Sequence, residues 1–264
     1  MGINSNILTP EGRHAALAAL EWQMELGVTE ITGEEPVDRY ALPDTLKPVA
    51  AAIAMAETAA PLALALDAVE MARAAAAEAE TLEDLRATVA AFDGCELKRG
   101  AKNTVFADGN PAARVLILGE APGREEDAEG RPFVGRAGQL LDLMFAAIGL
   151  SRASPDPAQA LYITNVMPWR PPQNRDPKPE EIAIMRPFVE RHIALVNPDF
   201  IVCMGNTPCL ALLGTSGILR LRGNWAQSLG KLVLPMTHPA YLLRNPAGKR
   251  DAWADLLVLK ARLG

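Results

Sequence analysis

Short apolar runs alternate with helix-periodic segments along the second half of the chain. Runs of this length and apolarity are typical of strands buried on both faces, and they lie at 115–119, 161–165, 200–205 and 232–236. Segments with apolar residues at helical spacing lie at 137–148, 179–196, 207–213 and 248–263. Such alternation predicts a three-layer α/β/α fold, in which helices cover both faces of a central, mainly parallel four-stranded sheet.

The first ninety residues follow a different pattern. Residues 11–26 repeat apolar positions at helical spacing, whereas alanine dominates 48–80. Alanine favours helix but offers little bulk for packing, so this region is either a small helical accessory or partly disordered. We therefore expect an acidic, alanine-rich extension over residues 1–90, with a helix at 82–92 leading into a domain at 91–264.

The distribution of charge divides the chain at the same place. The net charge is −6, which is unfavourable for binding a polyanion. Residues 1–94, however, hold 16 acidic and 5 basic residues, whereas residues 95–264 hold 16 acidic and 21 basic residues. The second part is therefore basic enough to meet DNA, and the first part is not.

The number of cysteines and the length of the apolar runs indicate where in the cell the protein works. The chain has three cysteines, Cys95, Cys203 and Cys209, too few for a disulfide framework or a complete metal site. No apolar run reaches the roughly 18 residues of a membrane span, and the first residues lack the order of a signal peptide. We expect a cytoplasmic protein without a membrane partner, and a monomer by default.

A long connection follows the first apolar run. Roughly twenty residues separate that run from the next helix, whereas a plain connector needs about 2–6. The connection contains Gly119-Glu120-Ala121-Pro122-Gly123, an acidic run at Glu125-Glu126-Asp127, and Phe133 between glycines. The acidic run alone could be a solvated turn, and a lone phenylalanine is usually a core residue. An aromatic ring on a glycine-flanked loop can also stack on a flat ligand.

Polar residues follow the second strand as well. Asn165 ends the run 161–165, where its amide could read the edge of a nucleobase or cap a turn. Arg170 and Arg175 flank a proline-rich stretch. They could grip phosphates, or the stretch could be a solvated connector.

The last strand leads into a histidine and an unusual tip. His238 is followed by Pro239. A lone histidine is usually structural, but this one stands at a strand end. An apolar and aromatic tip that ends in a basic residue is typical of a wedge that enters a base stack while arginine meets phosphate. The tip consists of Tyr241, Leu242, Leu243 and Arg244.

Together these motifs resemble family-4 uracil-DNA glycosylases. The similar segments are Gly-Glu-Ala-Pro-Gly at 119–123, Gly-Arg-Pro-Phe-Val-Gly at 130–135, Asn-Val at 165–166, Pro-Pro-Gln-Asn-Arg at 171–175 and His-Pro-Ala-Tyr-Leu-Leu-Arg at 238–244. The match runs from about Cys95 to the carboxyl terminus. The resemblance implies that the chain has the fold of these glycosylases and that it is a hydrolase of DNA repair. Such an enzyme flips uracil out of DNA and hydrolyses its N-glycosidic bond, which leaves an abasic site for base excision repair.

The resemblance also implies roles for individual residues. Glu126 would orient water or support the cationic sugar, Asn165 would read the edge of uracil, and His238 would stabilise the departing uracil anion. A carboxylate near the sugar and a donor near the base stabilise the transition state selectively. The uracil pocket would be formed by Glu120, Ala121, Phe133 and Asn165. DNA would be contacted by Arg170, Arg175, Tyr241, Leu242, Leu243 and Arg244.

One departure from the family concerns its cofactor. Family-4 enzymes usually hold a four-iron, four-sulfur cluster through four cysteines, and the corresponding positions here are Phe92, Cys95, Trp169 and Met185. A cluster cannot assemble on one thiolate, so we expect no cofactor.

Two other functions remain open at this stage. One is a catalytically inactive module of the same fold that binds uracil-containing or abasic DNA. The other is a nucleotide-binding α/β enzyme that uses 119–123 as a phosphate loop. The acidic run and the missing Gly-Lys-Ser/Thr ending argue against the second alternative.

Overall fold

A six-stranded sheet lies at the centre of residues 66–264, the part of the chain that the computed structural model describes. The strand order is β1-β3-β2-β4-β6-β5, and the inner four strands are parallel while the two edge strands pair antiparallel. The inner strands are β2 Val115–Gly119, β3 Leu161–Asn165, β4 Phe200–Met204 and β6 Lys231–Met236. The edges are β1 Ala107–Gly109 and β5 Ala226–Ser228.

The expected α/β fold is confirmed, and so are the four parallel strands. The sheet is wider than the four strands expected, because β1 and β5 extend it. Each edge strand has three residues, and none of them is fully buried. Strands so short and so exposed carry no apolar run, which is why the hydrophobic pattern did not indicate them. The helix expected at residues 11–26 lies outside the described residues.

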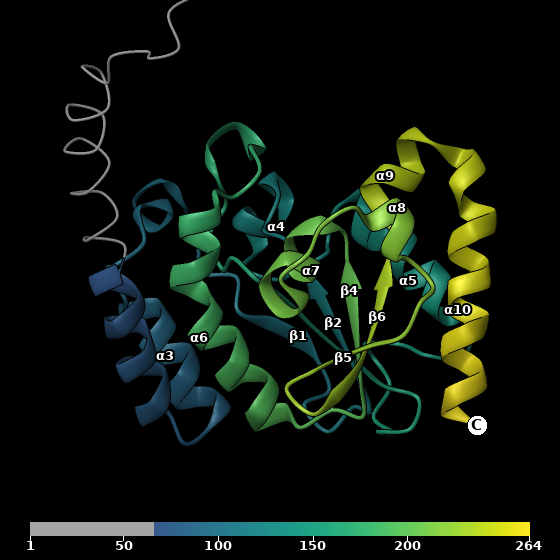
Figure 1. Ribbon diagram of the computed structural model, residues 1–264, viewed down its shortest axis with the longest axis horizontal. Helices are drawn as coiled ribbons and strands as arrows, with labels where there is room; N and C mark the ends of the chain where they lie inside the picture. The colour runs from purple at the N-terminus through teal and green to yellow at the C-terminus, as the bar shows by residue number, and fades with distance from the viewer. Residues whose placement is uncertain (1–65) are drawn as a thin grey trace, which may run out of the picture. The chain divides into compact units, whose positions relative to one another are not determined.

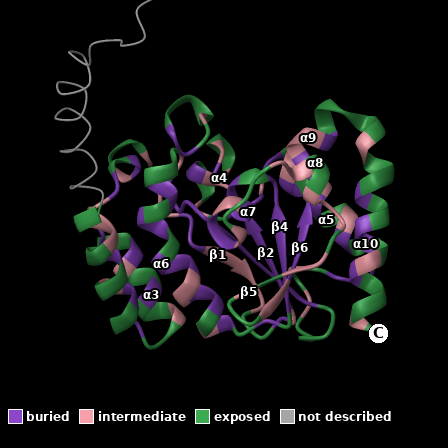
Figure 2. Cartoon of the chain, viewed as in Figure 1, coloured by how far each residue is buried: buried purple, intermediate pink, exposed green. Residues whose placement is uncertain are grey.

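Alternate side chains of β2 divide the core into two layers. Leu116 and Leu118 point into a cluster that also holds residues of three helices. These helices are α3 Leu82–Ala91, α6 Pro179–Val196 and α7 Asn206–Leu213. All five residues of each of the strands β2, β3 and β4 are buried, as Figure 2 shows for the centre of the domain.

The opposite face of the sheet packs against two other helices. Val115 and Ile117 belong to a second apolar cluster, which includes residues of α5 Arg136–Ala146 and α10 Lys249–Leu263. Helices therefore cover both faces, as the sequence predicted (Figure 1). Burying one aliphatic side chain in this way contributes about 1.5–3 kcal/mol.

The alanine-rich segment is helical where the structure describes it. Residues 66–78 form a helix, and a capping box between Thr81 and Asp84 starts α3. Ala72 and Ala76 are buried in the same cluster as α6, and Arg191 of α6 donates a 2.7 Å hydrogen bond to the carbonyl of Ala79. The predicted boundary at residue 90 falls inside this packed unit, and a separate extension over residues 1–90 stays a prediction.

Short helices crowd the carboxyl ends of the parallel strands. They are α4 Arg124–Glu129, α8 Ile218–Leu221 and α9 Pro239–Arg244. In Figure 1 the labels of these helices lie toward the end to which the arrows of β4 and β6 point. Within residues 66–264, no helix combines the length and apolarity that crossing a bilayer would need.

A buried histidine ties α6 to the sheet. His192 shares a 2.8 Å hydrogen bond with the Tyr162 hydroxyl of β3, and its ring stacks on Phe106 at 4.5 Å between centroids. Burial lowers the pKa of His192 to about 3 from an ordinary value of 6.5. The imidazole is therefore neutral in the folded protein under mild acid, where the unfolded chain would carry a proton.

This difference predicts an acid-sensitive fold. Between pH 6.5 and about 3 the unfolded state binds a proton at His192 that the native state does not. The free energy of unfolding should therefore decrease as the pH is lowered through this range. The slope from one such group approaches about 1.4 kcal/mol per pH unit. Urea unfolding of the wild type and His192→Gln across this window should show a shallower slope for the variant. Equal slopes would contradict the prediction.

Candidate active site

A cleft of about 520 Å³ opens at the carboxyl ends of the parallel strands. Its volume falls within the roughly 300–1,000 Å³ that small-ligand sites occupy. Each parallel strand contributes to its lining, with Glu120 after β2, Asn165 at the end of β3, Asn206 after β4 and His238 after β6. In the sheet, β3 lies on one side of β2 and β4 lies on the other, so the direction in which successive strands are added reverses at β2. Open α/β sheets bind ligands at such a switch point.

The register of β2 and β3 brings two predicted residues together. Gly119 pairs with Asn165 across the strands, and the N–H of Val166 donates to the carbonyl of Gly119 at 2.9 Å. A Cβ atom at Gly119 would collide with Asn165 Oδ1 and with the ring of Phe133. Glycine is therefore required here, and the amide of Asn165 and the ring of Phe133 converge over it.

Two buried polar atoms have no hydrogen-bond partner among the described residues. They are Asn165 Oδ1 and Thr237 Oγ1, and both residues line the cleft. Leaving such an atom unsatisfied costs about 1–3 kcal/mol. A bound molecule with a hydrogen-bond donor would remove that cost at Asn165.

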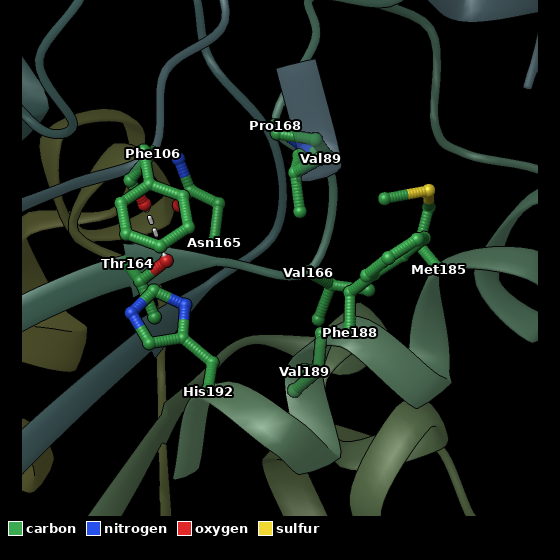
Figure 3. A pocket seen from close by; sticks show the side chains of 10 residues that line it. All are labelled: Val89, Phe106, Thr164, Asn165, Val166, Pro168, Met185, Phe188, Val189 and His192. Atoms are coloured by element: carbon green, nitrogen blue, oxygen red, sulfur yellow. Dashed lines mark hydrogen bonds between the residues drawn. The ribbon is translucent and has the colours of Figure 1, made fainter. Parts of the chain in front are cut away.

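The polypeptide behind Asn165 is rigidly held. Figure 3 shows Asn165 beside Phe106 and Thr164, next to a small second cavity of about 20 Å³. The Thr164 hydroxyl donates a 2.7 Å hydrogen bond to the carbonyl of Phe106. Asn165 therefore lies at the end of a strand whose preceding residue, Thr164, is fixed by a hydrogen bond to the segment before β1.

His238 lines the cleft, and a hydrogen bond from the backbone defines its tautomer. It caps the N-terminus of α9, where its Nδ1 accepts a 3.1 Å hydrogen bond from the N–H of Ala240. Because a nitrogen that accepts cannot carry the proton, the neutral ring holds its proton on Nε2. Burial lowers the pKa of His238 to about 4, and the charge of Arg244 adds to this effect. The ring lies 5.4 Å from Phe133 between centroids.

The acidic run is helical rather than a solvated turn. Glu125, Glu126 and Asp127 form the first turn of α4. Both carboxylate oxygens of Glu126 accept backbone hydrogen bonds, from the N–H groups of Gly123 at 3.0 Å, Val134 at 3.0 Å and Gly135 at 2.9 Å. A carboxylate can accept about four hydrogen bonds. Glu126 therefore binds the two halves of the long connection together and keeps room for one more donor.

Glu120 brings a second carboxylate to the cleft. Glu120 was expected in the uracil pocket, but its carboxylate was given no role; the residue lines the cleft, and its carboxylate accepts a 2.6 Å hydrogen bond from the Thr207 hydroxyl. Burial raises the pKa of Glu120, and the bond from Thr207 partly opposes this. The available signal was its position at a strand end beside the switch point. Sequence reasoning did miss Asn206 and Thr207, which line the cleft and stand in the corresponding position after β4.

The two arginines expected to grip phosphates have protein partners. Arg175 lines the cleft, but its guanidinium forms two hydrogen bonds to Glu181, at 2.6 and 2.9 Å. Arg170 lies outside the cleft lining and donates to Asn174 at 2.7 Å. Of these two arginines the structure brings Arg175 to the cleft, where its charge is paired with that of Glu181.

The tip after His238 is the short helix α9 and is not uniformly exposed. Tyr241 and Arg244 line the cleft, and Leu243 is 36% exposed. Leu242 is only 1% exposed, so its assignment to an exposed wedge is corrected. A helix turns consecutive residues to different sides, and Leu242 is the one that packs inward.

Bulky side chains occupy the positions of the family's cluster ligands. Phe92, Cys95, Trp169 and Met185 are all buried. Phe92 packs edge-on against Phe188 at 5.0 Å, and Figure 3 shows Met185 beside the cavity of only about 20 Å³. Burial raises the pKa of the Cys95 thiol, which disfavours the thiolate that iron would need. These residues do not fit a cluster, and within residues 66–264 no three or more histidine, cysteine or acidic side chains are placed so that they could hold a metal ion.

Comparison with known proteins agrees with the geometry. The model of the uracil DNA glycosylase superfamily matches residues 106–257. A type-4 uracil-DNA glycosylase of Thermotoga maritima is 43% identical over 154 residues, which is 57% of this chain and 77% of the relative. A type-4 uracil-DNA glycosylase of Archaeoglobus fulgidus is 37% identical over 172 residues, 61% of this chain and 82% of the relative. A type-5 uracil-DNA glycosylase of Pyrobaculum aerophilum is 28% identical over 149 residues, 52% of this chain and 66% of the relative.

The geometry of His238 predicts its titration. We expect a neutral ring protonated at Nε2, with a protonation midpoint near 4. The chain has three histidines, so nitrogen-15 NMR of the imidazoles can follow each one, and a His238→Gln variant assigns the signal. A midpoint near 6.5, or a proton on Nδ1, would contradict the prediction.

Proposed function

The chain belongs to the uracil-DNA glycosylase superfamily, and we propose that it is a DNA repair hydrolase that flips uracil out of DNA and hydrolyses its N-glycosidic bond. The product is an abasic site, the substrate of base excision repair. The observation that supports this most is the convergence of Asn165, Phe133 and His238 on one cleft at the switch point of the sheet.

Recognition of the base rests on Asn165 and Phe133. Uracil carries a ring N–H between two carbonyls, and an amide offers an acceptor for that N–H and a donor for a neighbouring carbonyl. The unpartnered Oδ1 of Asn165 supplies the acceptor. Flipping a base costs a few kcal/mol, and stacking on Phe133 together with these hydrogen bonds offsets the cost. Cytosine has no proton at the corresponding ring nitrogen and would leave Oδ1 unpaired.

His238 stabilises the leaving group as a neutral donor. When the bond between sugar C1′ and uracil N1 breaks, its electron pair moves into the ring and onto the carbonyl oxygens. The Nε2–H of His238 donates to this developing anion. With a pKa of about 4 the ring is neutral near pH 7. A fixed donor of this kind acts most strongly where charge develops, and its loss typically costs about 10²–10³-fold in rate.

The carboxylates act on the sugar and on water. Glu126 is proposed to orient the attacking water through its one free acceptor position and to stabilise the cationic sugar by its charge. Water adds its oxygen to C1′ and releases a proton to a carboxylate, and the uracil anion is protonated from solvent. Glu120 is a second candidate to receive the proton, because burial raises its pKa. Glu120 and Ala121 both line the cleft, and we propose that their backbone lies beside C1′.

Contacts to DNA are proposed for the rim of the cleft. Arg244 and Tyr241 line it, and Leu243 is the exposed apolar residue that could enter the base stack. Arg170 lies farther out, and Arg175 would reach a phosphate only by giving up part of its pairing with Glu181. We propose that the protein works as a cytoplasmic monomer.

We also propose that the enzyme works without an iron-sulfur cluster. The cluster of the family lies outside the chemical step in this scheme, and its volume is taken by packed side chains. Trp169 is 1% exposed and donates from Nε1 to the Thr104 hydroxyl at 3.1 Å. Packing of this kind can hold the loops that a cluster would otherwise join.

Turnover on DNA tests the proposed function. A single-stranded or duplex oligonucleotide with one uracil should gain an alkali-labile site, and a thymine oligonucleotide should not. Glu126→Ala, Asn165→Ala and His238→Ala should each lower the rate about 10²–10⁴-fold, because each removes a contact to the reacting groups. Gel electrophoresis after alkali treatment measures the rate.

Matched controls separate a lost contact from a lost fold. Glu190→Ala removes a carboxylate of α6 that pairs with Arg186 at 2.7 Å and lies outside the cleft lining, and it should keep full activity. Normal rates in all three site variants would refute the assignment of roles. Tight binding of uracil-containing DNA without any product would instead identify an inactive binding module.

The absence of a cluster has its own test. Protein purified under anaerobic conditions should contain no stoichiometric iron and no visible absorption band. Cys95→Ser should keep uracil release within a few-fold of wild type, because no metal depends on that thiol. Iron bound in stoichiometric amount, lost in Cys95→Ser together with activity, would overturn the proposal.

A further inference from the structure

Arg152 lies outside every motif that pointed to the cleft, yet its side chain is only 13% exposed. Its Nε donates to Asp142 at 2.8 Å, and its Nη1 donates to Asp108 at 3.1 Å. The same Nη1 donates to the carbonyl of Pro132 at 2.9 Å, and Nη2 donates to the carbonyl of Phe133 at 3.0 Å. The guanidinium therefore bonds two consecutive carbonyls of the long connection.

Phe133 needs to be held in place. Its φ is 53°, in the left-handed region, which is a genuine outlier for a bulky residue. Its carbonyl packs so closely on Gly138 that a Cβ atom there would collide with it. A backbone conformation of this kind persists only where the surroundings impose it. Arg152 supplies two hydrogen bonds at this point, one to the strained residue and one to the residue before it.

The two carboxylates orient the guanidinium. Asp108 lies on β1 and Asp142 on α5, so Arg152 is held from two elements before it meets the carbonyls. Arginine suits this task because its planar fork keeps its donors in a fixed geometry, which the single ammonium of lysine cannot reproduce. Arg152, Asp108 and Asp142 are not among the residues that line the cleft.

We propose that Arg152 is a positioning residue, which fixes the strained backbone of Phe133 so that its ring faces the base. This inference rests on the proposed function, in which that ring stacks on uracil. Glu126 holds the two residues after Phe133 by accepting hydrogen bonds from the N–H groups of Val134 and Gly135. Arg152 anchors the residues up to Phe133 through their carbonyls. The aromatic residue is therefore held from both sides along the chain.

A spectroscopic test needs no substrate. The Phe133 ring lies 5.4 Å from the His238 ring at an interplanar angle of 30°, so its ring current shifts the His238 proton signals. In Arg152→Met these signals should move, because the ring is no longer fixed. Arg114→Met is a matched control, since Arg114 donates to Asp199 at 2.6 Å and to the carbonyl of Leu263 at 3.2 Å and touches no cleft residue. It should leave the His238 signals in place.

Kinetics test the consequence for turnover. A misplacement of about 1 Å can cost about 10²-fold in rate, so Arg152→Met should lower kcat/KM on uracil DNA by about that factor. Arg152→Lys keeps a charge for the carboxylates but cannot reproduce the fork, and it should show a similar loss while keeping the melting temperature near that of wild type. In a Phe133→Ala background, the same changes at Arg152 should have almost no further effect.

The outcomes separate this inference from the proposed function. Unmoved His238 signals in a folded Arg152→Lys protein, or losses that multiply with Phe133→Ala, would overturn the positioning role. Shifted signals together with a loss that disappears in the Phe133→Ala background would establish it. A wild type that releases no uracil would overturn the proposed function, while the NMR comparison would still decide whether Arg152 positions the Phe133 ring.

Discussion

The parallel register of β2 and β3 is the constraint on which the active site depends. It sets Gly119 beside Asn165, and the pairing of β2 with β4 and of β4 with β6 brings His238 to the same edge. The side chains of these strands are buried on both faces, so a slip of one residue would exchange the two apolar layers. The packing of the core thereby determines which polar residues meet in the cleft.

Charged side chains hold the long connection by bonding its backbone. Glu126 accepts from three N–H groups, and Arg152 donates to two carbonyls. Hydrogen bonds to ionised groups are about twice as strong as neutral ones. In this way the charged side chains stabilise the conformation of the connection. Trp169 and Met185 are buried at two of the positions where the family usually has cysteines.

Much of the fold could be predicted because its signals are local. The central strands are continuous apolar runs, and α6 begins and ends at the predicted residues, Pro179 and Val196. The edge strands β1 and β5 and the helix α4 could not be predicted in this way. The edge strands are defined by their hydrogen bonds to longer neighbours, β3 and β6. The helix α4 is stabilised by hydrogen bonds between Glu126 and residues that follow the helix, Val134 and Gly135, which a local pattern does not show. Leu242 was misplaced because its burial depends on the packing of α9.

Several features can be recognised in the sequence alone: the succession of strands along the chain, the basic second half, the glycosylase motifs, and Phe92, Trp169 and Met185 at three positions where the family usually has cysteines. These are properties of neighbouring residues or of composition. Three contacts became visible only in the folded chain: the carboxylate of Glu120 bonds Thr207 at the cleft, Arg175 pairs with Glu181, and Arg152 bonds the carbonyl of Phe133. Each of these contacts joins residues whose distance in space is set by packing, and no local pattern encodes that distance.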